Sequence, residues 1–423
     1  MKILLINKYL YPKGGDAKYT LATGKLLSEK GHEVFYWGMD HPENQEFPFR
    51  QYFVPYIDLN GNLNGREKLR ASLNIFYSSG AKKKLAALLK KIKPDLVHLN
   101  NFAHQLSPSI LDAVKGRKIP AVMTMHDYKM VCPCYTMFSG DSGSLDGAGT
   151  SGGSPCERCG GGKYFNCVVK KCTKGSVFKS LVNACEMYLH HHVLKIYGKI
   201  DLYISPSRFL MQKVKEMGFP WEVCHLPNFA DLSGVPAFKW ESQEIAYAGR
   251  FSHEKGVHML LDAVKGSGVK LKIIGDGPLA GGIAEKIKKE KLGENVRMLG
   301  YLKGHQLQRE IIRSAFLVVS STWYENNPLS IIEAFSLGKP VLGARIGGIP
   351  ELVRDGETGF TFEAGNAADL RDKINRMLRE KQKLPEMGKR AREFAERYLD
   401  PEIHYHGLTE LYGKAIEINR ARR

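Results

Sequence analysis

The chain has 423 residues, 43% hydrophobic side chains and a formal net charge of +18. A chain of this length is expected to form two domains, and its ordinary apolar fraction argues against a disordered protein. No apolar run reaches the ~20 residues that span a bilayer, and Met1–Asn7 is too short for a signal peptide. The sequence therefore argues against a membrane-spanning protein and predicts a cytoplasmic one.

The positive charge is concentrated in the first half. Residues 1–228 contain 31 Lys and Arg against 18 Asp and Glu, which leaves +13. Such a surface attracts nucleic acid, anionic lipid or a phosphorylated acceptor, and a merely solvated basic surface is an equal alternative. No nucleic-acid-binding module is recognisable, which disfavours nucleic acid. The lysines at 82–84 and at 90, 91 and 93 fall in one helical stretch and favour an anionic membrane surface.

Short apolar runs alternate with longer helical patterns, which is typical of parallel sheets covered by helices. In the first half the predicted strands are Lys2–Asn7, Glu33–Trp37, Asp95–Leu99, Ala121–Met125 and Asp201–Ile204. The helices predicted between them are Lys18–Glu29, Lys82–Lys91 and Lys179–Tyr197.

The alternation restarts in the second half, which predicts a second doubly wound sheet. Its predicted strands are Glu244–Ala248, Val269–Ile274, Val296–Leu299, Phe316–Ser320 and Pro340–Gly343. Its predicted helices are Val257–Val264, Ile283–Lys291, Leu329–Leu337 and Ala368–Arg379. Asn228–Ser242 is the expected linker, and Ser139–Ser154 is a flexible loop by composition.

We therefore predict an α/β protein with two Rossmann-like domains. The first covers residues 1–228, contains a Cys-rich insertion at 130–175, and is completed by a C-terminal helix at 401–423. The second covers residues 229–400. Ligands of such sheets bind at the carboxyl ends of the strands, so two facing sheets would share one cleft.

The strongest group of polar residues follows the predicted strand Phe316–Ser320. Asn327 is a suitable N-cap and the next residue is a proline, so a helix that includes Leu329 is expected to begin here and to favour a phosphate at its N-terminus. Glu325 lies before this helix and Glu333 lies inside it, where the two carboxylates can bind hydroxyls on either side of a diphosphate. Alone, such a pair of glutamates is more often a cap and a solvated helix residue.

Two cations follow the predicted strand Glu244–Ala248. Arg250 and Lys255 occur in the sequence Gly-Arg-Phe-Ser-His-Glu-Lys-Gly, at the carboxyl end of that strand. Fixed cations at this place stabilise the charge that builds on a diphosphate leaving group, without a metal ion. The alternative is two solvated basic side chains.

Together these motifs resemble the family-4 retaining glycosyltransferases of GT-B fold. The resemblance runs from about Ile245 to Leu378 and includes Gly-Asp-Gly-Pro at 275–278 and the run Gly347–Gly359. It implies that Arg250 and Lys255 hold the donor diphosphate, Glu325 contacts the donor sugar and Glu333 binds the ribose. It places the turn of Gly277 near the nucleotide base. The sequence departs from many relatives at Asn326 and Asn327, which bears on the choice of sugar.

The turn at 275–278 also fits a relaxed dinucleotide fingerprint. That fingerprint requires an acidic residue after the next strand, and Val296–Leu299 is followed by Gly-Tyr-Leu-Lys. A nicotinamide site is therefore disfavoured.

The first half agrees with the resemblance. Gly14 and Gly15 follow the first strand, where paired glycines let backbone amides approach a phosphate, although an ordinary turn is the alternative. His126 follows strand Ala121–Met125, and a His at this point of the family lines the sugar side of the cleft. Its predicted role is polar contact with a hydroxyl, and a structural loop histidine is the alternative. Asp95 and His98 are expected to be structural.

Six of the eight cysteines lie between positions 132 and 172. Disulfides are rare in a reducing cytoplasm, so the cluster indicates a metal first. The predicted structural zinc ligands are Cys132, Cys156, Cys159 and Cys172, with Cys134 and Cys167 as further candidates. A subset of the family carries a similar insertion. Disulfides or free thiols and an iron–sulfur cluster remain alternatives.

The predicted function is transfer of a sugar, with retention, from a nucleotide diphosphate sugar to a glycan or lipid-linked acceptor of surface polysaccharide or lipopolysaccharide synthesis. No catalytic cofactor is expected. The protein is expected to lie at the inner face of the cell membrane as a peripheral protein. The alternatives are a nucleotide-sugar epimerase or hydrolase on the same fold and a non-catalytic glycan-binding subunit.

Overall fold

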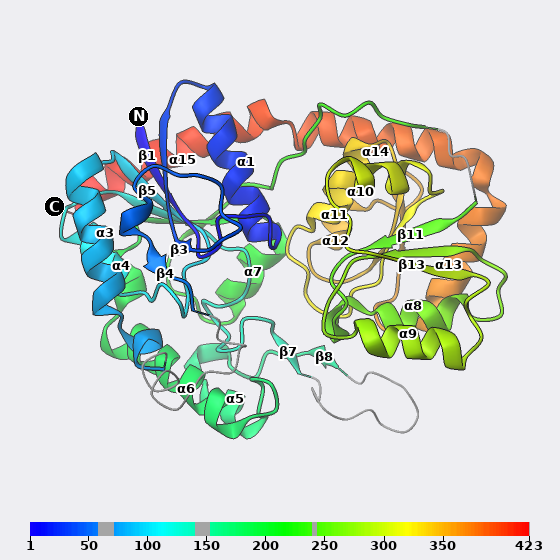
Figure 1. Cartoon of the computed structure of the whole chain (residues 1–423), viewed down its shortest axis with the longest axis horizontal. Coiled ribbons are helices and arrows are strands. Elements are labelled where there is room, and N and C mark those ends of the chain that lie inside the picture. Colours follow the sequence, from blue (N-terminus) through cyan, green and yellow to red (C-terminus); the bar gives the residue numbers. More distant parts are fainter. Residues whose placement is uncertain (58–71, 140–152, 239–242, 423) are drawn as a thin grey trace. The chain divides into compact units, whose positions relative to one another are not determined.

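A computed structural model of the chain describes residues 1–57, 72–139, 153–238 and 243–422. They form two compact units (Figure 1). The first unit comprises residues 1–136, 157–226 and 404–423, and the second comprises 137–156 and 227–403. Most of the predicted loop Ser139–Ser154, and residues 239–242 of the predicted linker, lie outside the described residues.

The first unit is built on a six-stranded parallel sheet in the order β10-β9-β6-β5-β1-β2. Its strands are β1 (Lys2–Ile6), β2 (Glu33–Trp37), β5 (Leu96–Leu99), β6 (Ala121–Thr124), β9 (Leu202–Ser205) and β10 (Val223–His225). Two small sheets pair β3 (Met39–Asp40) with β4 (Val54–Pro55) and β7 (Phe138–Ser139) with β8 (Ser154–Pro155).

Helices cover the sheet of the first unit on both faces (Figure 1). The helices of this unit are α1 (Gly15–Glu29), α3 (Ser79–Ile92), α4 (Ile110–Lys115), α5 (Phe165–Val169), α6 (Val177–Tyr188), α7 (Arg208–Glu216) and α15 (Pro401–Ala421). On one face, Leu408 and Tyr412 of α15 pack against Ile3 and Leu5 of β1. The apolar residues of β1 that point to the other face of the sheet are buried as well. Burial on both faces is expected for a strand inside a parallel sheet.

The second unit holds a six-stranded parallel sheet in the order β13-β12-β11-β14-β15-β16. Its strands are β11 (Ile245–Ala248), β12 (Leu271–Ile274), β13 (Val296–Gly300), β14 (Leu317–Val319), β15 (Val341–Ala344) and β16 (Gly359–Phe362). Its helices are α8 (Val257–Val264), α9 (Ala280–Lys289), α10 (His305–Ile312), α11 (Leu329–Ser336), α12 (Ile349–Leu352), α13 (Ala367–Arg379) and α14 (Leu384–Tyr398).

The two doubly wound sheets confirm the predicted fold class. In the second sheet the strand order reverses between β11 and β14, which is where a sheet of this kind binds its ligand. In the first sheet the corresponding place lies between β1 and β5.

One predicted helix is wrong in its extent. The pattern predicted a continuous helix over Lys179–Tyr197, but α6 ends at Tyr188 and continues as a π-helical turn over Leu189–Val193. Buried His190 of this turn hydrogen-bonds the Glu186 carboxylate at 2.9 Å and the Phe76 carbonyl oxygen at 2.6 Å. These tertiary bonds accompany the wider turn, and helical periodicity does not report them.

Candidate active site

The candidate site of the second unit is formed by the loops that follow the neighbouring strands β11 and β14. Lys255 follows β11 and Glu325 follows β14, and the ammonium Nζ lies 2.6 Å from the carboxylate Oε1. The Ser321 hydroxyl donates to the same carboxylate oxygen at 2.5 Å. The structure therefore brings together two of the predicted site residues, which are 70 positions apart in the chain.

The electrostatics of this pair keep the Glu325 carboxylate ionised. Glu325 is only 5% exposed, and burial alone would raise the pKa of its carboxyl group. The Lys255 ammonium and the Ser321 hydroxyl outweigh burial and hold that pKa below its usual value. The ammonium also lies over the Trp323 ring, 5.0 Å from its centroid. The result is a fixed, ionised carboxylate beside a fixed cation.

Glycines of the recognised motifs let these loops approach each other. Gly256 has φ +67°, and a Cβ there would lie 1.9 Å from the Ser320 carbonyl oxygen at the end of β14. Gly347 has φ +60°, and a Cβ there would lie 2.3 Å from the Glu325 carbonyl oxygen. These close approaches place the Lys255 loop and the run beginning at Gly347 directly against the Glu325 loop.

Arg250 lies on the same loop as Lys255, with its side chain exposed to solvent. The turn that contains Gly277 supports this loop, because the Phe251 amide donates to the Asp276 carbonyl oxygen at 2.9 Å. A Cβ at Gly277 would lie 2.5 Å from the Phe251 carbonyl oxygen. The turn predicted to lie near the base therefore packs against the loop that carries the two cations.

Helix α11 begins at Leu329, the first residue of the predicted helix Leu329–Leu337. Pro328 occupies the N-cap position, so the predicted capping role of Asn327 is wrong. The Asn327 side-chain oxygen instead accepts a hydrogen bond from the Asn228 amide at 3.1 Å, and its carbonyl oxygen accepts from the Asn228 side chain at 3.0 Å. Asn327 thus anchors the loop to the segment that enters the second unit.

The helix still points its first backbone amides into the carboxyl end of the sheet, as a phosphate site requires. Glu333 is the fifth residue of α11 and is half-buried. The two glutamates therefore lie on either side of the helix N-terminus, one before it and one inside it.

In the first unit, the predicted phosphate-contacting glycines lie at the N-terminus of α1. The pattern placed the helix start at Lys18, but α1 begins at Gly15, with Gly14 as its N-cap. The glycines therefore belong to the helix N-terminus itself, a backbone arrangement that suits an anion.

His126 follows β6 and forms a hydrogen bond between its Nε2 and the Asn100 side-chain oxygen at 2.8 Å. Burial lowers the pKa of the His126 imidazole to about 4, so the ring is neutral near pH 7. The Asn100 side chain is 1% exposed, and its Nδ2 has no hydrogen-bond partner among the described residues. Sequence reasoning missed Asn100, although its place directly after β5 was a usable signal.

Asn100 and His126 line a small cavity at the carboxyl ends of β5 and β6. Its volume of about 20 Å³ is enough for one water molecule, and Asn101, Asp127 and Lys129 complete the polar part of its wall. The neighbouring His98 hydrogen-bonds the hydroxyl groups of Tyr412 and Thr124 and is fully buried, in agreement with a structural role.

A buried ion pair fixes the chain just after His126. The Lys129 ammonium lies 2.5 Å from the Glu186 carboxylate of α6 and donates to the Pro133 carbonyl oxygen at 3.2 Å. Both side chains of the pair are at most 5% exposed. The start of the Cys-rich segment is therefore held against α6.

The cysteines of the Cys-rich segment form no disulfide among the described residues, and four of their thiols are in contact. The sulfur atoms of Cys132 and Cys134 lie 3.5 Å apart, and Cys172 hydrogen-bonds both Cys134 and Cys167. Within the described residues, no group of three or more His, Cys, Asp or Glu is arranged to hold a metal ion. The four-cysteine zinc set predicted from the sequence, which includes Cys156, stays a prediction.

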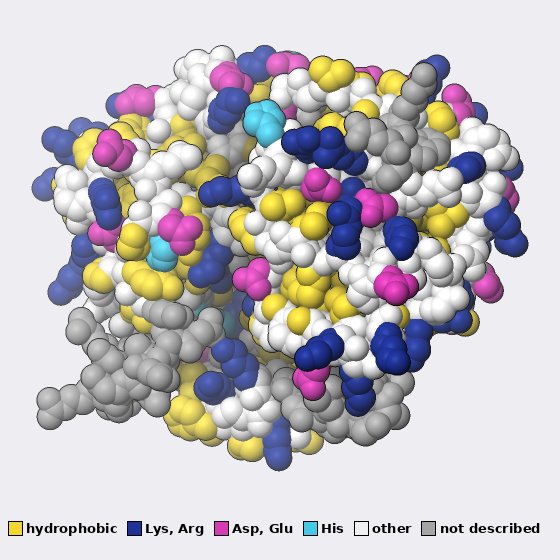
Figure 2. All heavy atoms as spheres, turned by 45° about the vertical axis from the view of Figure 1, so that its right-hand side comes forward, with side chains coloured by type: hydrophobic (Ala, Val, Ile, Leu, Met, Phe, Trp, Pro, Cys, Tyr) yellow, Lys and Arg dark blue, Asp and Glu magenta, His cyan; other side chains and the backbone are white. Residues whose placement is uncertain are grey.

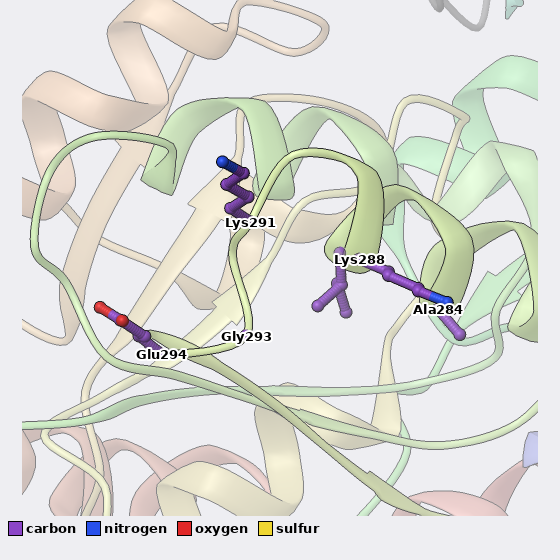
Figure 3. Close-up of a pocket in the computed structure, with 6 residues that line it drawn as sticks. Ala284, Lys288, Lys291, Gly293 and Glu294 are labelled. Carbon is purple, nitrogen blue, oxygen red and sulfur yellow. The ribbon is translucent and has the colours of Figure 1, made fainter.

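A larger pocket, of about 520 Å³, lies at the end of α9 and in the turn before β13 (Figure 3). It is lined by Ala284, Ile287, Lys288, Lys291, Gly293 and Glu294. The turn before β13 is at the amino ends of the strands, whereas Arg250, Lys255 and Glu325 follow the carboxyl ends. This pocket is therefore separate from the candidate site.

Comparison with known families gives two matches along the chain. Residues 13–142 match the family Glycosyltransferase Family 4, and residues 231–394 match the family Glycosyl transferases group 1. The first match includes Gly14, Gly15 and His126, and the second includes Arg250, Lys255, Glu325 and Glu333. The matches support a family-4-like glycosyltransferase of GT-B fold.

Two curated relatives are similar in sequence. N-acetyl-alpha-D-glucosaminyl L-malate synthase from Bacillus anthracis is 24% identical over 92% of this chain and 91% of its own length. Lipopolysaccharide 1,2-N-acetylglucosaminetransferase from Salmonella typhimurium is 32% identical over 33% of this chain and 40% of its own length. Relatives of this chain are therefore glycosyltransferases, some of them in polysaccharide and lipopolysaccharide synthesis.

Solved structures support the fold over the whole chain. Sucrose-phosphate synthase from Thermosynechococcus elongatus superimposes with a TM-score of 0.72 at 18% identity, covering 98% of each chain. HepE from Anabaena, in complex with UDP and glucose, superimposes with a TM-score of 0.65 at 18% identity, covering 98% of this chain and 99% of its own.

Proposed function

We propose that this family-4-like protein of GT-B fold is a retaining glycosyltransferase that uses a nucleotide diphosphate sugar and needs no catalytic metal ion. The observation that carries the proposal is the Lys255–Glu325 ion pair, 2.6 Å long, at the strand-order reversal of the second sheet. An ionised carboxylate beside a cation at this place suits a donor that presents hydroxyls next to a diphosphate.

In this proposal the cations act on the leaving group. As the bond between the anomeric carbon and the diphosphate oxygen breaks, negative charge builds on the diphosphate, and Lys255 and Arg250 stabilise it. The backbone amides at the start of α11 add a third source of positive potential. Preorganised charges of this kind stabilise the transition state without a Lewis-acid metal.

The carboxylates orient the donor. Glu325 accepts hydrogen bonds from hydroxyls of the sugar, and Glu333 accepts from the ribose, in line with the family resemblance. The low pKa of Glu325 supports this role, because an ionised carboxylate is a pure acceptor. The turn of Gly277 lies on the base side of the nucleotide.

The first unit supplies the acceptor side. Neutral His126 and the unpaired amide of Asn100 offer hydrogen bonds to a hydroxyl. The acceptor oxygen attacks the anomeric carbon on the face from which the diphosphate leaves, and the acceptor proton passes to a donor phosphate oxygen. The new glycosidic bond then keeps the configuration of the donor.

For the acceptor we propose a lipid-linked or polysaccharide intermediate of surface glycan synthesis, handled at the inner face of the cell membrane. The named activity of the Salmonella relative and the +13 charge of residues 1–228 support this choice. No helix of the described residues is long and apolar enough to cross a bilayer. The proposed membrane association is therefore peripheral.

Donor hydrolysis without any acceptor tests the proposal. The protein is incubated separately with UDP-, GDP- and ADP-sugars, with and without EDTA, and release of nucleoside diphosphate is measured. NMR of the first sugar released reports its anomeric configuration. Hydrolysis with retention, unaffected by EDTA, is the expected result. Inversion, loss of activity in EDTA that magnesium restores, or neither binding nor turnover of any donor contradicts it.

We also propose that the Cys-rich segment binds a structural zinc ion. Several thiols close together on one segment support this, because thiolates are the preferred ligands of structural zinc. A bound metal would tie the segment to the end of β6 and so help to position His126.

A further inference from the structure

The outward face of α6 is apolar. Val177, Phe178 and Leu181 are 50%, 67% and 47% exposed, and with exposed Cys185 they occupy one side of the helix. The opposite side, which includes Ala184 and Met187, is buried. A surface helix normally turns a polar face to water, so the apolar outward face of α6 requires a partner.

Neighbouring segments extend this apolar surface. Helix α5 packs against α6, and the Phe165 amide donates to the hydroxyl of Tyr188 on α6 at 3.3 Å. Phe165 and Val169 lie one helical turn apart on α5 and are 53% and 68% exposed. After α6, Val193 and Leu194 are 71% and 38% exposed. Residues 165–194 thus contain seven of the fifteen large hydrophobic side chains that are exposed in the described part of the chain.

The same surface is basic. Residues 158–195 contain seven Lys and Arg and one acidic residue, Glu186, which is buried and paired with Lys129. The exposed lysines are Lys163, Lys170, Lys171, Lys174, Lys179 and Lys195. Figure 2 shows hydrophobic and basic side chains together along the lower edge of the molecule, at the height where α5 and α6 lie in Figure 1.

We propose that this α5–α6 surface, formed by residues 163–195, docks on an anionic lipid bilayer. Its apolar side chains enter the headgroup region and its lysines meet the lipid phosphates. Charge complementarity favours lipid, because a basic rim with no exposed acidic residue matches a negative surface. The proposal rests on the proposed function, since a lipid-linked acceptor lies at a membrane.

The structure favours this surface over the lysines of α3 that the sequence singled out. The Lys82 ammonium donates to the Tyr77 hydroxyl at 2.8 Å, and the Lys84 ammonium donates to the Phe53 carbonyl oxygen at 2.7 Å. The apolar residues of α3, such as Leu85 and Leu88, are buried. Helix α3 therefore offers charge without an apolar face.

Vesicle flotation of the full chain tests the proposal. Vesicles of phosphatidylglycerol and phosphatidylcholine are compared with pure phosphatidylcholine at low salt. Phe178→Glu with Leu181→Glu should lower partitioning by well over tenfold, since burial of one such side chain alone contributes about tenfold. Lys170→Gln with Lys171→Gln should lower it by roughly twenty-five-fold, since each lysine contributes about fivefold. The controls are Val235→Glu with Tyr301→Glu, which are exposed in the second unit, and Lys90→Gln with Lys91→Gln on α3.

Donor hydrolysis in solution separates this proposal from the proposed function, because the α5–α6 variants should hydrolyse the donor at the wild-type rate. Loss of partitioning only in those variants supports the docking surface. Wild-type partitioning of Phe178→Glu with Leu181→Glu overturns it, as does loss confined to the α3 variant. Absence of vesicle binding at low salt, or a dimer that the α5–α6 variants dissociate, assigns the face to another partner and also overturns it.

Discussion

The Lys255 ammonium and the Glu325 carboxylate lie 2.6 Å apart, and each keeps the other in place at the carboxyl end of the second sheet. Removal of the cation leaves a buried carboxylate without its main partner and a leaving group without one of its stabilising charges. Lys255→Ala should therefore lower turnover by about 10²–10³. Steady-state donor hydrolysis measures this, with Lys289→Ala on the exposed side of α9 as the control. Near-wild-type turnover of Lys255→Ala would show that the pair is only structural.

Gly256 and Gly266 form a matched pair for testing the loop geometry. Both have positive φ, +67° and +69°, but an added Cβ meets the Ser320 carbonyl oxygen at 1.9 Å in the first case and open space in the second. Gly256→Ala should displace the Lys255 loop and reduce activity at least as much as Lys255→Ala. Gly266→Ala should cost only the backbone strain, of order 1–3 kcal/mol, and leave turnover unchanged. Urea unfolding and donor hydrolysis distinguish the two effects, and equal activity in both variants would contradict the geometry.

Glu333→Ala should weaken nucleotide binding more than turnover. Loss of a hydrogen bond to a charged group costs about 1.5–3 kcal/mol, so the dissociation constant for the nucleoside diphosphate should rise roughly 10–100-fold. Isothermal titration calorimetry with the nucleotide checks this, and Glu285→Ala on α9 is an exposed control. An unchanged dissociation constant with reduced turnover would indicate that Glu333 contacts the reacting sugar and not the ribose.

Because the protein contains buried histidines, we expect it to be less stable in mild acid than at neutral pH. Burial lowers the pKa of His98 to about 3, and burial likewise lowers the pKa of His104 to about 3. In the unfolded chain these imidazoles titrate near 6.5, so below that pH the unfolded state binds protons that the folded state does not. The free energy of unfolding should therefore be highest above pH 6.5 and fall toward pH 4.

Each such histidine contributes a slope of at most about 1.4 kcal/mol per pH unit. Urea denaturation at pH 7, 6 and 5 measures the trend. A variant such as His98→Gln should show a shallower slope between pH 6.5 and 4 than the wild type. Stability that rises as the pH is lowered through this range would contradict the burial of neutral histidines.

The cysteines allow a direct test of which thiols hold zinc. The sequence predicts Cys132, Cys156, Cys159 and Cys172, whereas the structure places Cys134 and Cys167 in contact with Cys172. If the predicted set binds the metal, protein purified without chelator should contain about one zinc per chain, Cys156→Ser should lose it, and Cys134→Ser should keep it. Elemental analysis decides. Loss only in Cys134→Ser would assign the metal to the contacting thiols, and a colourless protein without metal would refute zinc.

Periodicity alone located the strands of both sheets that lie nearest the site. Buried central strands are short apolar runs bounded by turn residues, so β1, β6, β11 and β15 are predicted within a residue or two, as is the edge strand β2. The edge strands β10 and β16 were missed. Gly359 is the first residue of β16, and a Cβ there would lie 1.8 Å from the Val341 carbonyl oxygen. A strand that must begin with glycine resembles a turn in the sequence.

The sequence by itself determined the fold class and the positions of Arg250, Lys255, Glu325 and Glu333, because residues that follow strands of a parallel sheet must lie at its carboxyl end. Only the tertiary structure decided what those residues contact. The Lys255–Glu325 bond, the role of Asn327 as an anchor and the unpaired amide of Asn100 depend on loops far apart in the chain. The apolar outward face of α6 was equally hidden, because helical periodicity identifies an apolar stripe but not whether another element covers it.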